Sequence, residues 1–368
     1  MTTAFYFDES CFWHFGGNYA SVARVGGLVQ PQTGGGLPEN PETKRRLKNL
    51  MDVTGLSAEL DCRSAPAATR EMLERVHPSS YLDSFKAMSD EDGGEMGLRT
   101  PFGPGAFEIA AQSAGLAVGA LASVLSGEHK NAYSLSRPPG HHCLPDYPMG
   151  FCLLNNIGIA IRAAQAATPG LRVAVVDWDV HHGNGTEAVF YDDPSVLTIS
   201  MHQEHNFPMD KGGVEDQGEG DGLGYNVNIP LCPGAGDDAF LYAYDSIIRP
   251  RLTAFAPDVI IVACGFDASS IDPLSRMMAG SFTFNSLTER VMADADALCG
   301  GKLLLVHEGG YSELHVPFCG HGVIQRMAGS STEAPDPLAD RMRAHQPNDR
   351  ARAFHRSIID DLATQLGL

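Results

Sequence analysis

The sequence is short of positive charge, of paired cysteines and of long apolar runs, and each shortage argues against a class of protein. Its 26 lysines and arginines face 45 aspartates and glutamates, which gives a formal net charge of −19. Proteins that bind nucleic acid normally carry a basic patch, so this balance argues against such a partner. The charge is compatible with a cationic substrate, but solubility alone explains it equally well.

The eight cysteines are scattered over 368 residues and form no C-x-x-C pair. The first residues include neither a basic segment nor a long apolar core. Together these features predict reduced thiols and a cytoplasmic protein. No membrane span is expected, and the most apolar helical segment, 109–125, is rich in alanine and glycine and is predicted to be a core helix.

Apolar segments of strand length alternate with segments of helical length in the rest of the chain. The predicted strands are 131–136, 171–176, 196–201, 225–230, 259–264 and 302–306. The predicted helices include 43–51, 155–167, 238–254, 286–298 and 350–366. Apolar strands between helices indicate β-α-β units and a mainly parallel sheet that is covered on both faces. No linker divides the chain, so one domain is expected.

Most of these strands lead into a polar loop, often rich in glycine. Active sites of open α/β sheets gather at the edge where parallel strands end, so several polar loops there predict a catalytic site. The most informative loop begins at Asp177, directly after the strand 171–176. In an extended chain, residues two apart point to the same side, so Asp179 and His181 can reach one ion. An oxygen and a nitrogen donor suit a divalent metal such as zinc.

Five motifs, in this order along 6–323, resemble those of the zinc-dependent histone deacetylase family, in particular its class II and bacterial histone-deacetylase-like amidohydrolase members. They are R-P-P-G-H-H, G-F-C-L-L-N-N, D-W-D-V-H-H-G-N-G-T, G-F-D-A and E-G-G-Y. The resemblance implies an arginase/deacetylase-like α/β fold with a central, mostly parallel eight-stranded sheet flanked by helices. It also implies one deacetylase-like catalytic domain over 1–368, which removes acetyl or related acyl groups from lysine-type amides.

The resemblance assigns roles to the polar loops. One zinc ion is expected on Asp179, His181 and Asp267, with a fourth position open to water and substrate, as in catalytic zinc sites. His142 is the expected general base and acid, and His141 is expected to lie deeper and stabilise charge. The division of proton transfer between these two histidines stays open.

The resemblance also predicts the partners of the histidines and the group that stabilises the oxyanion. Asp177 would pair with His141, and Asn184 would pair with His142. An amide stabilises imidazolium less than a carboxylate does, so a lowered pKa is expected for His142. Tyr311, placed by a Gly-Gly hinge, is the expected hydrogen-bond donor to the oxyanion.

Substrate and potassium sites complete what the resemblance implies. Gly150, Phe151 and Phe207 would line a narrow tunnel for the methylene chain of an acyl-lysine, with Leu274 beside it. Potassium would bind mainly to backbone carbonyls, so these sites leave little signature in the side chains. The first potassium site would use Asp177, Asp179, His181, Ser200 and Met201, and a second would use Phe190, Val196 and Tyr225.

Three alternatives remain. Acetylpolyamines could be the substrate, but class II-type polyamine enzymes place a Glu where this chain has Leu274; an acidic loop such as 89–95 could supply that charge instead. A binuclear manganese ureohydrolase needs more carboxylates than the motifs offer. A non-catalytic acyl-lysine binder would not need the complete set of ligands, histidines and Tyr311. The expected partners are acetylated lysine peptides or small acetylated amines, and hydroxamate inhibitors; the chain could form a homo-oligomer.

Overall fold

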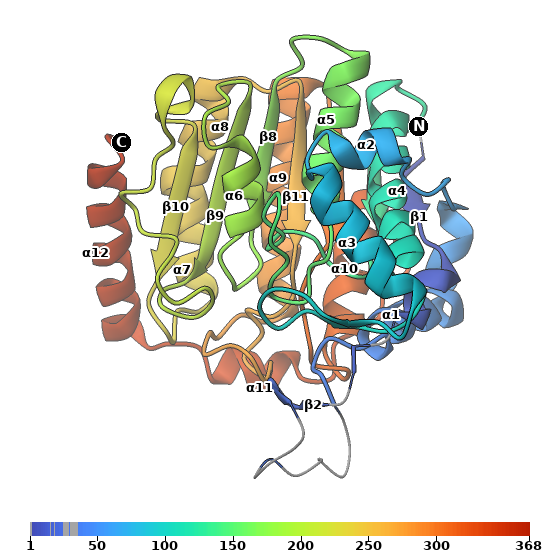
Figure 1. The fold of residues 1–368 in the computed structure, drawn as a ribbon. Coiled ribbons are helices and arrows are strands. Elements are labelled where there is room, and N and C mark those ends of the chain that lie inside the picture. Colours follow the sequence, from blue (N-terminus) through green and yellow to red (C-terminus); the bar gives the residue numbers. More distant parts are fainter. Residues whose placement is uncertain (1, 15, 18, 25–28, 30–35) are drawn as a thin grey trace.

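An eight-stranded sheet forms the centre of the protein in the computed structural model, which describes all residues except 1, 15, 18, 25–28 and 30–35. All neighbouring strands in this sheet are parallel. Across the sheet the order is β10 (Asn226–Leu231), β9 (Val196–Gln203), β8 (Val173–Asp177), β11 (Val259–Cys264), β12 (Leu303–His307), β7 (Asn131–Ser134), β1 (Ala4–Tyr6) and β4 (Asp61–Arg63). The predicted arginase/deacetylase-like sheet is confirmed, and it is parallel throughout (Figure 1).

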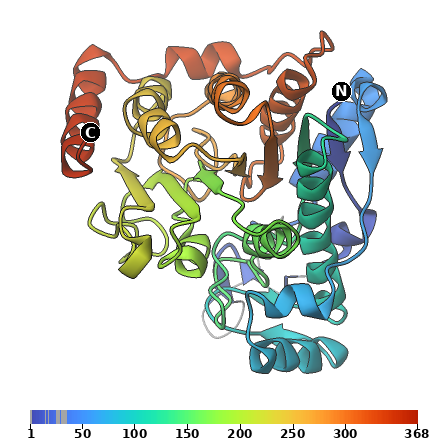
Figure 2. The ribbon, with the colours of Figure 1, turned by 90° about the horizontal axis from the view of Figure 1, so that it is seen from above.

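Helices cover both faces of the sheet (Figures 1 and 2). On one face, α4 (Ala106–Leu125) and α5 (Asn156–Ala167) share a core with Val173 and Val175 of β8. On the other face, α1 (Glu42–Thr54), α9 (Ser281–Cys299) and α10 (Val316–Ala328) share a core with the intervening β8 residues Ala174 and Val176. Because both faces are buried, the strands are apolar at every position, which is the pattern that made them predictable.

The predicted core helix corresponds to α4. This helix is long and apolar enough to cross a membrane by length and composition, but 61% of its most apolar window is buried inside the protein. Its interior glycines allow close packing: a Cβ at Gly115 would lie 2.2 Å from the carbonyl oxygen of Pro66. Packing within the protein therefore accounts for its composition.

The predicted helix 238–254 differs from the structure. There, α7 (Asp237–Ala243) passes through a π-helical turn (Tyr244–Ile248) into α8 (Arg249–Phe255). Pro250 has no N–H, and in a regular helix its ring would clash with the carbonyl four residues earlier, so the wider turn accommodates it. The start of α9 also lies five residues before the predicted 286, since Phe282 and Phe284 are buried.

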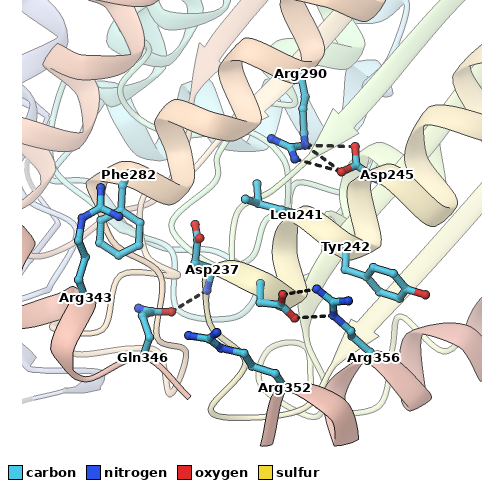
Figure 3. Close-up of a pocket in the computed structure, with 11 residues that line it drawn as sticks. Asp237, Leu241, Tyr242, Asp245, Phe282, Arg290, Arg343, Gln346, Arg352 and Arg356 are labelled. Atoms are coloured by element: carbon cyan, nitrogen blue, oxygen red, sulfur yellow. Dashed lines mark hydrogen bonds and ion pairs between the residues drawn. The ribbon is translucent and has the colours of Figure 1, made fainter. Parts of the chain in front are cut away.

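The C-terminal helix α12 (Asp349–Gln365) packs against α7, and Arg343 of α11 (Ala339–Ala344) lies over the ring of Phe282 in α9. Ile359 and Leu362 join the core described for α9, and Arg356 Nε donates to Asp238 at 2.8 Å (Figure 3). A cavity of about 440 Å³ lies among these helices. Its described lining contains arginines and aspartates but no histidine or cysteine, so it does not match the chemistry that the motifs predict.

Candidate metal centre and active site

The polar loops of five strands meet at the carboxyl edge of the sheet. Because β7, β8, β9, β11 and β12 are parallel and lie within one run of neighbours, the residues that follow them come together. These loops carry His141 and His142, Asp177 to Asn184, Phe207, Asp267, and Tyr311, in the order of the sequence. The side chains of the motifs therefore come together at the carboxyl edge of the sheet, where the sequence predicts the site.

Three of these side chains converge on one point. The ligand atoms of Asp179, His181 and Asp267 all lie within 4.8 Å of one another. His181 Nδ1 lies 3.0 Å from Asp179 Oδ1 and 3.1 Å from Asp267 Oδ2. Both aspartates are fully buried. Two carboxylates and one imidazole form a donor set that suits a divalent ion of zinc type.

Backbone groups hold these carboxylates in place. Gly309 N–H donates to Asp179 Oδ2 and Val180 N–H donates to Asp267 Oδ1, each at 2.8 Å. A Cβ at Gly309 would lie 2.2 Å from Asp267 Oδ2 and 2.7 Å from Asp179 Oδ2, so only glycine allows this approach. One oxygen of each carboxylate is thus held by a backbone N–H and the other lies beside the His181 ring; in Asp179 that second oxygen also accepts the N–H of His181 at 2.9 Å.

A cation between the carboxylates of Asp179 and Asp267 would also reduce the repulsion between their charges. Burial, together with the negative charge of Asp179, raises the pKa of Asp267 to about 6. Two carboxylates in one buried site repel each other unless a positive charge lies between them. The residues present therefore fit a divalent cation.

His141 and His142 occupy different electrostatic environments although they are adjacent. Burial alone would lower the pKa of His141, but Asp179 and Asp177 raise it to about 10. Burial, followed by the positive charges of His141 and His181, lowers the pKa of His142 well below its usual value. Without a metal ion, the neighbouring carboxylates thus favour the charged form of His141, whereas burial and the neighbouring positive charges favour the neutral form of His142.

The partners predicted for these histidines are in contact with them. His141 Nδ1 lies 3.0 Å from Asp177 Oδ2, and His142 Nδ1 lies 2.7 Å from Asn184 Oδ1. Since Asn184 Oδ1 can only accept, His142 Nδ1 carries the hydrogen and its Nε2 is the free basic atom. His142 is therefore arranged as a base, whereas His141 is arranged as a fixed positive charge.

Tyr311 lies against the metal-ligand cluster, with its ring centroid 6.3 Å from that of His181. The preceding Gly310 has φ +122°, a backbone conformation that favours glycine. Burial, with Asp267 and Asp179 nearby, raises the pKa of the Tyr311 hydroxyl well above its usual value. The phenol therefore remains a hydrogen-bond donor at neutral pH.

Two buried carboxylates that support these side chains were not predicted. Asp272 accepts from the N–H of Tyr311 at 2.7 Å and of Leu274 at 2.9 Å. Glu308 accepts from the N–H of Gly140 at 2.7 Å and of His141 at 3.1 Å. The place of Glu308 directly after β12, inside the E-G-G-Y motif, was a signal that could have marked it.

A second group of potential ligand atoms consists of His141, Cys152 and Glu308. Burial, with Glu308 nearby, raises the pKa of the Cys152 thiol well above its usual value, so it stays protonated. Because metal binding requires a thiolate, this group is a poorer metal site than Asp179, His181 and Asp267.

A narrow tunnel of about 110 Å³ leads to these residues, and its lining includes Gly150, Phe151, Phe207 and Leu274. His142, His181 and Tyr311 lie in the same lining. Gly150 has φ +58°, and a Cβ there would lie 2.3 Å from His142 Cδ2. The described lining also contains Val22, Arg99 and Asn206, which the motifs did not indicate.

The predicted potassium residues lie on adjacent strands. Asp177 at the end of β8 is paired in register with Ser200 of β9, and Met201 follows. Phe190, Val196 and Tyr225 lie at the end of α6 (Asn184–Phe190), at the start of β9 and just before β10. Both potassium sites stay predictions.

The fold and the site together define an α/β protein of arginase/deacetylase-like fold, with a buried cluster of potential metal ligands at the base of a tunnel. A histone deacetylase domain matches residues 37–327. The chain is 54% identical to the histone deacetylase-like amidohydrolase of Pseudomonas aeruginosa over 366 residues, which cover 100% of this chain and 96% of that protein. It therefore belongs to the histone deacetylase family, whose members hydrolyse amides.

Two further relatives agree. The probable deacetylase of Archaeoglobus fulgidus is 37% identical over 305 residues, covering 81% of this chain and 84% of that protein. The crystal structure of the HDA15 HD domain matches with a TM-score of 0.81 and 31% identity, covering 100% of this chain and 97% of that chain. The family resemblance predicted from the five motifs is confirmed.

Proposed function

We propose that this protein is a zinc-dependent amidohydrolase that removes acetyl or related acyl groups from lysine-type amides. The observation that carries the proposal is the convergence of Asp179, His181 and Asp267 within 4.8 Å, beside His142 in the lining of a narrow tunnel. One metal ion fits the three ligands, whereas a binuclear manganese site would need further carboxylates. Bound there, zinc would supply Lewis acidity to the reacting amide and water.

The proton transfers are assigned to His142. Its neutral Nε2 takes a proton from the attacking water, and the resulting imidazolium donates a proton to the leaving amine. His141 stays protonated, held by Asp177 at 3.0 Å, and its charge favours negative charge that develops on the substrate. Tyr311 donates its hydroxyl hydrogen to the oxyanion as the carbonyl becomes tetrahedral. This complete set of groups favours catalysis over simple acyl-lysine binding.

The tunnel favours an acyl-lysine. Phe207 packs edge-on against His142, with ring centroids 4.9 Å apart, and Phe151 lies 5.8 Å from Tyr311. Two aromatic walls enclose a methylene chain without a polar partner along its length. The described tunnel lining holds no carboxylate that could bind the distal ammonium of an acetylpolyamine. Acetylpolyamines are therefore the second candidate.

Potassium is proposed as a second cofactor on the backbone carbonyls of Asp177, Ser200 and Met201, where it would support the loop of the metal ligands. Residues 1–368 are proposed to form one catalytic domain. The buried side chains of α12 support this proposal, since Ile359 and Leu362 share a core with β8 and β11.

The test compares an acetyl-lysine peptide, a trifluoroacetyl-lysine peptide and an acetylpolyamine on zinc-loaded protein, with the metal content measured by elemental analysis. We expect one zinc per chain and the fastest turnover on the lysine peptides. Asp267→Asn should lose both metal and activity. The matched control is Asp83→Asn, which changes an exposed carboxylate on α3 (Ser79–Asp90) and should retain both. Stoichiometric metal and full activity in Asp267→Asn would refute the assignment.

A further inference from the structure

Apart from histidines, Arg99 is the one positively charged side chain in the described lining of the tunnel, and it is exposed at the tunnel mouth. We propose that Arg99 sets substrate specificity by charge: it favours an acyl-lysine that has an acidic neighbour and disfavours substrates with a nearby cation. This inference rests on the proposed function and names the substrate class that the same site prefers.

The backbone of Arg99 is attached to one wall of the tunnel. The carbonyls of Leu98 and Arg99 accept from the N–H groups of Gly150 and Phe151, each at 3.0 Å. Arg99 itself has φ +57°, which is uncommon for a residue other than glycine. These hydrogen bonds hold Arg99 in that conformation, beside the segment that carries Phe151.

The side chain of Arg99 reaches the opposite wall. Its guanidinium carbon lies 5.4 Å from the centroid of the Phe207 ring, a cation–π contact. Stacking uses the face of the guanidinium and leaves N–H groups at its edge for an anion. Arg99 therefore links the two aromatic walls and is held at the tunnel mouth by both.

In the part of the chain that the structure describes, no carboxylate forms an ion pair with Arg99 within 4 Å. The residues outside the description, which include 25–28 and 30–35, contain no aspartate or glutamate in the sequence. Apart from histidines, Arg99 is also the one ionised side chain in the described tunnel lining. This cation, unpaired among the described residues, contrasts with the net charge of −19.

The space beside Arg99 can hold the residue next to the acyl-lysine. A groove of about 590 Å³ shares Arg99 and Phe207 with the tunnel and is also lined by the exposed side chains of Leu98, Tyr147 and Met209. Its other charged residues are Asp210 and Lys211, whose charges are opposite, and Glu187, whose Oε2 accepts hydrogen bonds from Asn226 at 2.7 Å and Asn228 at 2.8 Å. In this groove Arg99 is therefore the positive charge that is available to bind an anionic group of the substrate.

The expected effect follows from the strength of exposed ion pairs. One such pair changes an equilibrium by about two- to fivefold, and a like-charge pair has the opposite sign at a similar magnitude. The ratio of kcat/KM between a peptide with Asp beside the acetyl-lysine and one with Lys there should therefore be about tenfold at low salt. The ratio should fall toward one as salt shortens the screening length to about 3 Å near 1 M.

The experiment measures kcat/KM on three peptides that differ only in having Asp, Gln or Lys beside the acetyl-lysine. The variants are Arg99→Gln, Arg99→Glu and Arg99→Lys. The control is Lys130→Gln, which removes an equal charge just before β7, at the opposite edge of the sheet. Thermal unfolding of each variant verifies that the protein is folded.

The wild type and Lys130→Gln should show the tenfold preference for Asp over Lys. Arg99→Gln should lower it to about twofold or less, Arg99→Glu should reverse it, and Arg99→Lys should retain most of it. Turnover of the Gln peptide is the reference for each variant, so a general loss of activity does not change the ratio between the Asp and Lys peptides. An equal preference in wild type and Arg99→Gln overturns the role of Arg99 while leaving the proposed function intact. Hydrolysis of none of the peptides by the wild type overturns both.

Discussion

Glu39 is the centre of a buried ion cluster, and replacing it by glutamine should cost the protein a large part of its stability. Its carboxylate accepts from Arg137 Nε at 2.9 Å, from Arg137 Nη2 at 3.1 Å and from Lys44 Nζ at 3.3 Å. All three side chains are buried. Glu39→Gln keeps the shape but leaves two buried cations without their counter-ion.

Two estimates of the stability that is lost in Glu39→Gln agree. Burial alone would raise the pKa of Glu39, but Arg137 and Lys44 lower it from 4.5 to about 2. At about 1.4 kcal/mol per pKa unit, the ionised form contributes about 3 kcal/mol at pH 7. Removing one partner from a buried ion pair typically costs about 3–5 kcal/mol. We therefore expect the free energy of unfolding to fall by about 3 kcal/mol.

The lowered pKa of Glu39 also determines how its contribution to the stability changes with pH. A depressed pKa stabilises the fold above the unfolded pKa of 4.5, and this contribution is lost as the pH falls through about 2. Glutamine does not titrate, so the difference between wild type and Glu39→Gln should shrink from about 3 kcal/mol at pH 7 to about 2 kcal/mol at pH 3.5.

Urea denaturation at both pH values measures this difference. Glu42→Gln is the control, since its exposed pair with Arg45 should contribute less than about 1 kcal/mol. A loss below about 1 kcal/mol in Glu39→Gln, or a loss that grows as the pH falls, would refute the reasoning. Activity should fall as well, because Lys44 Nζ lies 6.0 Å from the Tyr311 ring centroid and Arg137 begins the loop of His141.

Two further variants test the site. Tyr311→Phe should lower kcat by about 10²–10³-fold with little change in metal content, because it removes a donor used in the transition state; an unchanged kcat, measured at saturating substrate, would remove Tyr311 from the mechanism. Gly150→Ala should lower kcat/KM by at least about tenfold, since its Cβ would lie 2.3 Å from His142 Cδ2 and 2.8 Å from the Phe207 ring. Gly170→Ala also has positive φ but no atom within 4 Å, so it should affect stability alone, and equal kinetics in the two would contradict the packing argument.

The sequence reveals the metal ligands because their pattern is local. Asp179 and His181 are two residues apart after an apolar strand, and Asp267 follows another such strand, so alternation and the sheet edge bring them together. The strands β8 and β11 were predictable for the same reason: burial on both faces makes them continuously apolar. Strands β1 and β4 have three residues each, too few for a recognisable pattern.

The supporting residues could not be found this way, because their contacts are not local. Glu39 and Arg137 are 98 positions apart, and Asp272 reaches Tyr311 across 39. A lone glutamate in the loop before a helix gives no signal in the sequence that tells whether it is buried or exposed. The role inferred for Arg99 depends likewise on the fold, which places it between Phe151 and Phe207 although 108 positions separate it from Phe207.

The way the metal ligands are held has a consequence for catalysis. Asp179 accepts the backbone N–H groups of Gly309 and His181, and Asp267 accepts that of Val180, so both carboxylates are oriented before any ion binds. Because these donors belong to loops that follow different strands, the sheet sets the spacing of the two carboxylates. A preorganised site loses little free energy to rearrangement when the ion binds or when charge develops on the substrate. The rigid parallel sheet and the catalytic geometry are thus two aspects of one arrangement, in which strand register determines where the charges lie.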